Sequence, residues 1–262
     1  MAISTSLFTL VSKKALTHDV WELDFVASQK SWVIKGDFTS NPAQEMTSSE
    51  SYELDVIPGQ YILFLLPSGI RRAYSIAYSF VGSWIPLLNN DWSTKHSAEQ
   101  IFRFVIKRLA HEGAGSQQIC DLEVGESLQG MWPMGHFMLD STPKSTLFIG
   151  TGTGFAPLYY QIKFLCEQEN PPKMHFVFGV RSEVDAFYHE EIASAGVGFN
   201  QYYSSPVGNS GLKWYVTAYL TPENIAQFEQ FSICGSPAMV KSARDILEAA
   251  WVAKEYIKFE QY

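Results

Sequence analysis

The amino-acid sequence predicts an antiparallel β-barrel followed by a doubly wound α/β domain with a parallel sheet. In the first part of the chain, short strand-like segments alternate with turns, and little helix is indicated. After the polar segment at residues 140–144, apolar strands alternate with helical segments. Because 262 residues suffice for two ordinary domains, we expect one domain over residues 1–140 and a second over residues 141–262.

In the first domain, apolar residues alternate with polar ones or form short runs between turn residues such as Pro58-Gly59. The predicted strands are residues 7–17, 20–27, 61–66, 73–78, 101–109 and 127–132. A short helix is predicted at residues 116–122. The polar stretches at residues 28–51 and 82–99 are expected to be loops.

In the second domain, the predicted strands are near-continuous apolar runs, as a parallel sheet buried on both faces requires. They are residues 145–149, 173–180, 199–204, 231–234 and 256–260. The predicted helices are residues 155–167, 186–191, 221–227 and 238–250. A doubly wound sheet binds its ligand at the carboxyl ends of the strands.

Composition argues against several classes of function. The net charge of −8 disfavours non-specific binding to nucleic acid or to an anionic membrane. Cys120, Cys166 and Cys234 form no CxxC pair, so we expect no iron–sulfur cluster, structural zinc or other metal site. Neither a signal peptide nor a membrane-spanning apolar run is indicated. We therefore expect a soluble, cytoplasmic protein.

The most informative motif is a strand that breaks into alternating glycines and threonines before a helix, at residues 148–158. Glycine lets a ligand approach the backbone, and the N–H groups at a helix start favour an anion. The motif predicts a phosphate cradle. The alternative is a glycine turn that only closes a strand–helix corner.

A second motif is Arg72-Ala73-Tyr74-Ser75, in a predicted strand. Arg72 offers a guanidinium fork for a phosphate, and Tyr74 offers a ring that can stack on a flat ligand. Ser75 adds a small hydroxyl. Taken alone, these four residues also fit an ordinary edge strand.

Further motifs occur in a defined order around these two. They are Pro58-Gly59-Gln60-Tyr61, Phe104-Val105-Ile106-Lys107-Arg108, Gly113-Ala114-Gly115-Ser116, Met134-Gly135-His136-Phe137, Phe178-Gly179-Val180-Arg181 and Cys234-Gly235-Ser236-Pro237-Ala238-Met239. In this order the set resembles the ferredoxin–NADP reductase superfamily of flavoenzymes, in its single-chain type without an iron–sulfur domain. The resemblance runs from about Val56 to the C-terminus. It implies an FAD-binding β-barrel followed by an NAD(P)-binding domain.

The resemblance implies roles for residues of the barrel. Arg72 would hold the FAD pyrophosphate, Tyr74 would pack on the isoalloxazine ring, and Ser75 would lie near flavin N5, where hydride arrives. The other implied FAD-binding positions are Ala73, Val105, Ile106, Lys107, Gly113, Gly115 and Ser116.

For the second domain, the resemblance implies that Thr151, Gly152, Thr153 and Gly154 cradle the dinucleotide pyrophosphate. Cys234 and Gly235 would lie by the nicotinamide. Tyr262 would be the terminal aromatic residue that covers the flavin, and Glu260 is a candidate for tuning hydride transfer. Ser75, Cys234, Glu260 and Tyr262 are thus the candidate catalytic residues. For Cys234 the alternative is a small apolar filler at the end of a buried strand.

The nucleotide preference depends on the end of the second parallel strand. An acid there favours the ribose diol of NADH, whereas an arginine favours the 2′-phosphate of NADPH. Arg181 and Ser182 favour NADPH, while Glu183 and Asp185 oppose this. We expect NADPH first, with NADH as the alternative.

The resemblance implies a monomeric FAD-dependent oxidoreductase that moves electrons between NAD(P)H and a separate carrier, ferredoxin or flavodoxin. Such carriers are acidic, so a basic rim is expected, with candidates Lys13, Lys14, Lys107 and Arg108. The alternatives are the reductase component of an oxygenase, a free-flavin reductase and a non-catalytic dinucleotide-binding regulator. The glycine turn at residues 113–116 favours retained FAD over the free-flavin alternative.

Overall fold

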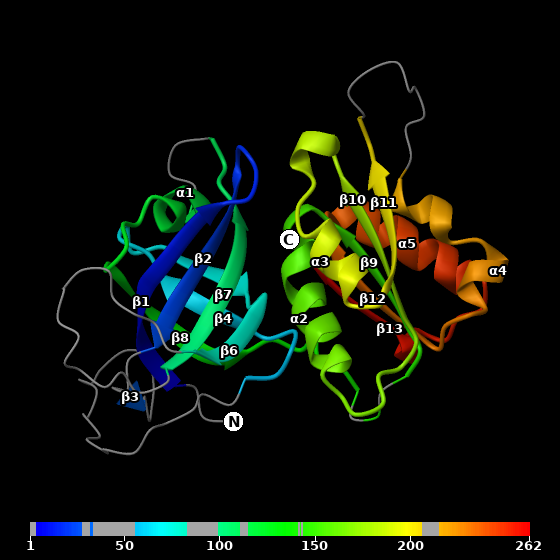
Figure 1. Cartoon of the computed structure of the whole chain (residues 1–262), viewed down its shortest axis with the longest axis horizontal. Coiled ribbons are helices and arrows are strands. Elements are labelled where there is room, and N and C mark those ends of the chain that lie inside the picture. The colour runs from blue at the N-terminus through cyan, green and yellow to red at the C-terminus, as the bar shows by residue number, and fades with distance from the viewer. Residues whose placement is uncertain are drawn as a thin grey trace. The chain divides into compact units, whose positions relative to one another are not determined.

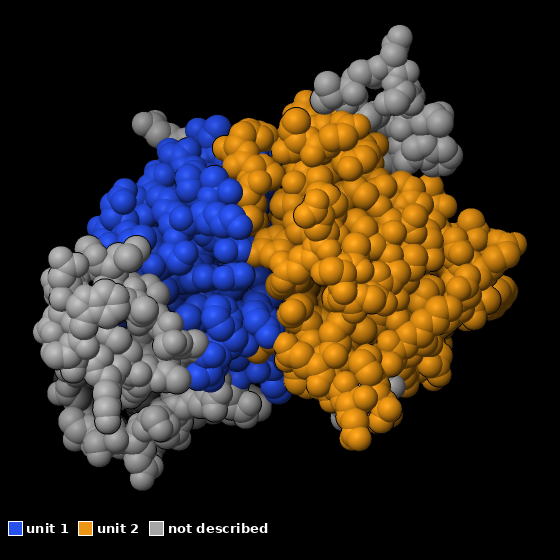
Figure 2. All heavy atoms as spheres, viewed as in Figure 1, with its two compact units in different colours: residues 1–15, 19–136 blue, residues 16–18, 137–262 orange. Residues whose placement is uncertain are grey.

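The computed structural model of the chain contains two compact units, which are coloured separately in Figure 2. It describes residues 4–27, 32–33, 56–82, 99–110, 115–140, 142, 144–205 and 215–262. Unit 1 comprises residues 1–15 and 19–136, and unit 2 comprises residues 16–18 and 137–262. The domain boundary that the sequence places between residues 140 and 141 stays a prediction.

Unit 1 is an antiparallel, barrel-like sheet with the strand order β5-β4-β8-β1-β2-β7-β6, in which β3 pairs with β1 (Figure 1). Its strands are β1 (Ser4–Ala15), β2 (Val20–Ala27), β3 (Trp32–Val33), β4 (Tyr61–Leu65), β5 (Arg71–Ser75), β6 (Tyr78–Gly82), β7 (Glu99–Lys107) and β8 (Ser127–Met134). The short helix α1 (Gly115–Cys120) precedes β8. The predicted fold class is confirmed for this unit.

Phenylalanine rings fill the interior of unit 1. Phe8, Phe25, Phe64, Phe102 and Phe104 are each fully buried and come from β1, β2, β4 and β7. Several pairs meet edge to face, with Phe8 and Phe104 each 5.4 Å from Phe64 between ring centroids. Since alternate residues of a strand face the same side, this core fixes which residues of β4 point inward.

The strand predicted over residues 73–78 is wrong, because the chain forms two strands there, β5 and β6. The backbone N–H of Ile76 donates to the Gln60 carbonyl (3.0 Å), and that of Ala77 donates to the Arg103 carbonyl (2.8 Å). The chain thus leaves β4 and joins β7 at this point, with both side chains fully buried. An exchange of pairing partner depends on distant strands, so local alternation does not reveal it. The predicted loop at residues 28–51 also contains β3, and most of both predicted loops lies outside the described residues.

Unit 2 is a parallel sheet with the strand order β11-β10-β9-β12-β13 and helices between the strands (Figure 1). The strands are β9 (Thr146–Thr151), β10 (Met174–Val180), β11 (Gly198–Tyr203), β12 (Gln230–Gly235) and β13 (Ile257–Gln261). The helices are α2 (Phe155–Cys166), α3 (His189–Ser194), α4 (Pro222–Ile225) and α5 (Pro237–Ala249). The α/β prediction is confirmed, although the helix expected at residues 186–191 begins at His189.

Helices cover both faces of the sheet in unit 2. Phe155 of α2 contacts Phe176 and Phe178 on one face of β10, with centroid distances of 6.1 and 5.5 Å. Val177 between them belongs to the buried cluster that includes Leu247 of α5. Burial on both faces explains why these strands are almost entirely apolar. Within the described part of the chain, no helix has the length and apolar character needed to span a membrane.

Candidate active site

The glycine–threonine loop follows β9 and leads into α2 through a 3₁₀ turn at Gly152–Gly154. A Cβ on Gly154 would lie 2.2 Å from the Cys234 carbonyl oxygen and 2.8 Å from the Gly235 Cα. A Cβ on Gly235 would lie 2.1 Å from Thr151 Oγ1. The loops after β9 and β12 are therefore in backbone contact, and this closeness requires glycine on both sides.

Polar contacts hold the turn between β12 and α5 against the same loop. The Ser236 N–H donates to Thr151 Oγ1 at 3.3 Å. Ser236 Oγ in turn accepts from the Met239 N–H at 3.4 Å and caps α5, which has Pro237 as its first residue. The amino ends of α2 and α5 thus start from adjoining loops at the carboxyl edge of the sheet, where a doubly wound fold binds its ligand.

The C-terminal strand brings further predicted residues to this edge. Cys234 of β12 pairs in register with Glu260 of β13. The Tyr262 hydroxyl is hydrogen-bonded to the Thr153 side chain. The Cys234 side chain is fully buried, and burial together with the Glu260 carboxylate raises the pKa of its thiol well above the usual value. The thiol is therefore neutral near pH 7 and contributes shape rather than charge.

In unit 1, Arg72 lies over the start of α1. A Cβ on Gly115 would lie 2.6 Å from Arg72 Cγ and 3.2 Å from Arg72 Nε, so a side chain at residue 115 would displace Arg72 from this position. The Arg72 Nη1 donates to the Arg71 carbonyl at 2.9 Å, and the residue is exposed. Tyr74 is half-buried beside it; burial raises the pKa of its phenol, the Cys120 thiol adds to this, and Arg72 opposes it.

The other predicted FAD-binding residues fall into different environments. Ser75 pairs with Tyr61 of β4 and is half-buried, whereas Ala73 is exposed. The Val105 and Ile106 side chains are 4% and 3% exposed, so these positions can offer a ligand mainly their backbone. Ser116 Oγ accepts from the Leu109 N–H at 3.2 Å. The predicted position Gly113 lies outside the described residues.

The side chains of the predicted basic rim already have local contacts. Lys107 Nζ lies 2.8 Å from an Asp19 carboxylate oxygen. Its ammonium is therefore already paired at a position that is also predicted to bind FAD. Arg108 donates twice to Asp121, at 2.8 and 3.0 Å. Lys13 Nζ donates to the Leu122 carbonyl at 3.1 Å. Lys14 is exposed. Two of the four cations of this rim are thus paired with carboxylates, so its net positive charge is smaller than the sequence indicates.

At the end of β10, Ser182 and Asp185 form a capping box. The Ser182 N–H and its hydroxyl both donate to Asp185 Oδ2, at 3.0 and 2.6 Å, and Ser182 is buried. The sequence analysis missed this pairing, although a serine followed three residues later by an acid is its usual signal. Arg181 beside it is exposed.

Comparison with known proteins shows which proteins the chain resembles. Residues 148–245 match the family described as "Oxidoreductase NAD-binding domain". The chain is 27% identical to ferredoxin–NADP reductase B of Sorangium cellulosum, over 78% of this chain and 84% of that protein. It is 24% identical to the toluate 1,2-dioxygenase electron transfer component of Pseudomonas putida, over 85% of this chain and 63% of that protein. The chain therefore spans less than two thirds of the latter relative.

Among solved structures, the ferredoxin reductase in carbazole 1,9a-dioxygenase superposes with a TM-score of 0.71 at 22% identity. The match covers 100% of this chain and 70% of that one, and it shows the shared fold. The chain resembles the ferredoxin–NADP reductase superfamily, the family of its sequence relatives and structural neighbours. The relatives are oxidoreductases, and members of that superfamily bind FAD and a nicotinamide dinucleotide.

The two cradles fit the pyrophosphate groups of FAD and of a nicotinamide dinucleotide. At Gly115, Gly154 and Gly235, neighbouring atoms approach the glycine backbone so closely that an added Cβ would collide with them. Such side-chain-free backbone next to a helix start is what a pyrophosphate requires. The cradle in unit 1 is paired with the Arg72 guanidinium, and that in unit 2 with the Thr153 hydroxyl.

Proposed function

We propose that the chain is an FAD-dependent oxidoreductase that moves electrons between a nicotinamide dinucleotide and a separate one-electron carrier, ferredoxin or flavodoxin. The observation that carries this proposal is the gathering of Thr153, Cys234 and Tyr262 at the carboxyl edge of the sheet in unit 2. Each comes from a different element, and a purely structural glycine turn would need none of the three together. The Arg72–Gly115 packing in unit 1 supports the same conclusion independently.

Bound FAD would accept a hydride, which carries two electrons, and release the electrons one at a time to the carrier. Arg72 and the backbone at Gly115 would hold its pyrophosphate through charge and N–H donors. The backbone of residues 152–154 would do the same for the dinucleotide. Cys234, as a neutral buried thiol, would shape the nicotinamide pocket without taking a proton.

Thr153 has two functions in this proposal. It belongs to the dinucleotide cradle, and its side chain holds the Tyr262 hydroxyl. If Tyr262 covers the reacting ring, this hydrogen bond must break before nicotinamide enters, which makes the displacement of Tyr262 a gating step.

A second candidate function is the reductase component of an oxygenase. It is favoured by the similarity to the toluate 1,2-dioxygenase electron transfer component and to propane 2-monooxygenase reductase components. The two candidates differ in the electron acceptor and share the chemistry of hydride uptake.

Anaerobic stopped-flow absorbance of the purified protein tests the proposal. We expect a yellow protein whose visible flavin band bleaches when NADH or NADPH is added. Subsequent reduction of ferredoxin or flavodoxin supports the first candidate, and reduction of only an oxygenase-type iron–sulfur protein supports the second. A colourless protein, or a flavin that neither nucleotide reduces, contradicts both.

A further inference from the structure

Tyr188 adopts a backbone conformation that residues other than glycine rarely take. Its φ is 58° and its ψ is 9°, in the left-handed region, at the residue that precedes α3. Among the described residues, Trp251 is the one other non-glycine residue with a positive φ. Such a conformation costs free energy and persists where the surroundings hold it, often at a ligand clamp. The contacts that hold Tyr188 are therefore informative about function.

The ring of Tyr188 packs on the first turn of α2. It stacks on Phe155, with the ring centroids 5.1 Å apart and an interplanar angle of 25°, and its centroid lies 5.1 Å from that of Tyr159. Phe155 and Tyr159 also stack on each other at 4.9 Å, one helical turn apart. Phe187 adds an edge-to-face contact with Phe155 at 5.2 Å. The segment that leads into α3 thus encloses the start of α2 with aromatic rings.

Phe155 connects this packing to the dinucleotide cradle. It follows Gly154 directly, its side chain is fully buried, and its N–H donates to the Gly152 carbonyl. Phe155 is therefore the residue at which the 3₁₀ turn passes into α2. Packing on its ring sets the orientation of the N–H groups at the helix start, and those groups bind a pyrophosphate only when they point toward it.

Polar contacts fix α3 to α2 at the same place. The Tyr159 hydroxyl donates to the Glu191 carboxylate of α3. The Ile192 N–H donates to the Tyr188 carbonyl at 3.1 Å. The Tyr188 hydroxyl, in contrast, is buried and has no hydrogen-bond partner within the described part of the chain. Tyr188 therefore contributes its ring to these contacts and not its hydroxyl.

We propose that Tyr188 is a positioning residue for the dinucleotide cradle. Its strained backbone places a ring against Phe155, and this ring holds the first turn of α2 in the orientation that presents its N–H groups to the pyrophosphate. The inference rests on the proposed function, because the cradle belongs to the same site. A residue that served only to start α3 would not need the ring.

Two substitutions separate the ring from the backbone. Tyr188→Phe keeps the ring and removes only the unpartnered hydroxyl. Tyr188→Asn removes the ring but suits the backbone, because asparagine enters the left-handed region more readily than most residues and is favoured at helix starts. Trp251→Asn is the matched control, since it makes the same kind of change at a left-handed aromatic residue whose side chain is 94% exposed.

Isothermal titration calorimetry of the flavin-loaded protein with NAD⁺ and with NADP⁺ measures the effect. The nucleotide that the unaltered protein binds more tightly is then used for all variants. We expect Tyr188→Asn to bind it roughly tenfold more weakly, the loss expected for one hydrogen bond to a charged group. Tyr188→Phe and Trp251→Asn should bind within about twofold of the unaltered protein. Flavin content should be the same in all four proteins, because the proposed FAD cradle lies in unit 1.

Unchanged nucleotide affinity in Tyr188→Asn overturns the inference and leaves the proposed function intact. So does an equal loss of affinity in Tyr188→Phe or in Trp251→Asn, and so does a loss of flavin together with nucleotide affinity in Tyr188→Asn. If Tyr188→Asn does not fold, Tyr188→Leu fills most of the same space without a flat ring, and a loss of roughly two- to tenfold is expected. Binding of neither nucleotide by the unaltered protein overturns both the inference and the proposed function.

Discussion

The backbone of Gly154 packs against the carbonyl of Cys234, because a Cβ at residue 154 would lie 2.2 Å from that oxygen. Two loops that are eighty residues apart in the sequence therefore touch without a side chain between them. Gly154→Ala must separate them, because backbone cannot move aside as a flexible side chain can. We expect the variant to bind NAD⁺ at least about tenfold more weakly, as a cradle displaced by a fraction of an ångström loses N–H contacts.

The control for Gly154→Ala is Gly196→Ala. Gly196 has a φ of +75° but open space around its Cβ position, so alanine there strains the backbone without a collision. Calorimetric titration with NAD⁺ and thermal unfolding should both be measured. Equal losses of affinity in the two variants would mean that general destabilisation, rather than the Gly154–Cys234 contact, controls binding.

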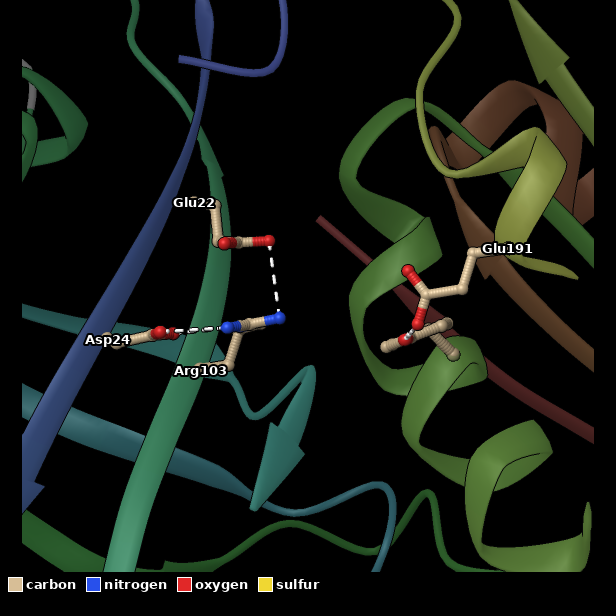
Figure 3. Close-up of polar contacts among 5 residues, drawn as sticks. Glu22, Asp24, Arg103 and Glu191 are labelled. Atoms are coloured by element: carbon tan, nitrogen blue, oxygen red, sulfur yellow. Dashed lines mark hydrogen bonds and ion pairs between the residues drawn. The ribbon is translucent and has the colours of Figure 1, made fainter. Parts of the chain in front are cut away.

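Arg103 is held between two buried carboxylates on the neighbouring strand β2, as Figure 3 shows. Its Nε and Nη2 donate to Asp24 at 2.8 Å each, and its Nη1 lies 3.5 Å from Glu22 Oε2. Arg103→Met leaves two buried carboxylates without this cation. We expect the free energy of unfolding of unit 1 to fall by about 3–5 kcal/mol.

The matched control is Lys241→Met, which removes a cation from the exposed surface pair with Asp245 on α5. An exposed pair of this kind contributes about 0–1 kcal/mol. Urea unfolding followed by circular dichroism compares the two variants. Similar, small losses for both would show that the Arg103 cluster is no more stabilising than a surface ion pair.

The sequence predicts those features of the site that depend on local chemistry. The predicted strand, glycine–threonine turn and helix over residues 145–167 are confirmed, because a strand end, a turn and a helix start are encoded by neighbouring residues. What the sequence does not show is which partner a side chain takes. In the structure, for example, Lys107 Nζ lies 2.8 Å from the Asp19 carboxylate, which its sequence position does not indicate.

The break after β5 has a similar origin. The pattern of residues 73–78 is that of one strand, but Ile76 bonds to Gln60, the residue before β4, and Ala77 bonds to Arg103 of β7. Pairing between distant segments depends on the whole barrel, which a short window of sequence does not contain. The capping box of Ser182 and Asp185 is local, and the spacing of a serine and an acid three residues later could have predicted it.

The buried thiol of Cys120 makes stability depend on alkaline pH. Burial, together with the charge of Asp121, raises the pKa of this thiol to about 12 from a usual value of 9.0. Above about pH 9 the unfolded chain therefore loses a proton that the folded protein keeps. The free energy of unfolding should fall as the pH rises, with a contribution of roughly 1 kcal/mol from this group at about pH 10.

Urea unfolding of the wild type and of Cys120→Ala at several pH values between about 8 and 10 isolates this contribution. The variant lacks the titrating thiol, so its stability should decline less steeply than that of the wild type. Parallel pH profiles for the two proteins would contradict the prediction, whatever their absolute difference in stability.

The hydrogen bond between Tyr262 and Thr153 can be tested by removing the Tyr262 hydroxyl oxygen alone. Tyr262→Phe keeps the terminal ring and leaves the Thr153 hydroxyl in the cradle, but it removes the bond that holds the ring in place. If the ring must move before nicotinamide binds, displacement becomes easier by about 0.5–1.5 kcal/mol. NAD⁺ should then bind roughly two- to tenfold more tightly.

Tyr256→Phe is the matched control, because Tyr256 precedes the same strand and its ring lies under Lys144 at 4.6 Å. It should leave NAD⁺ affinity unchanged. Weaker binding in Tyr262→Phe would mean that the hydroxyl contacts the nucleotide directly instead of restraining the ring. The distinction matters for mechanism, because a restraint makes the C-terminal residue a gate, whereas a direct contact makes it part of the binding site.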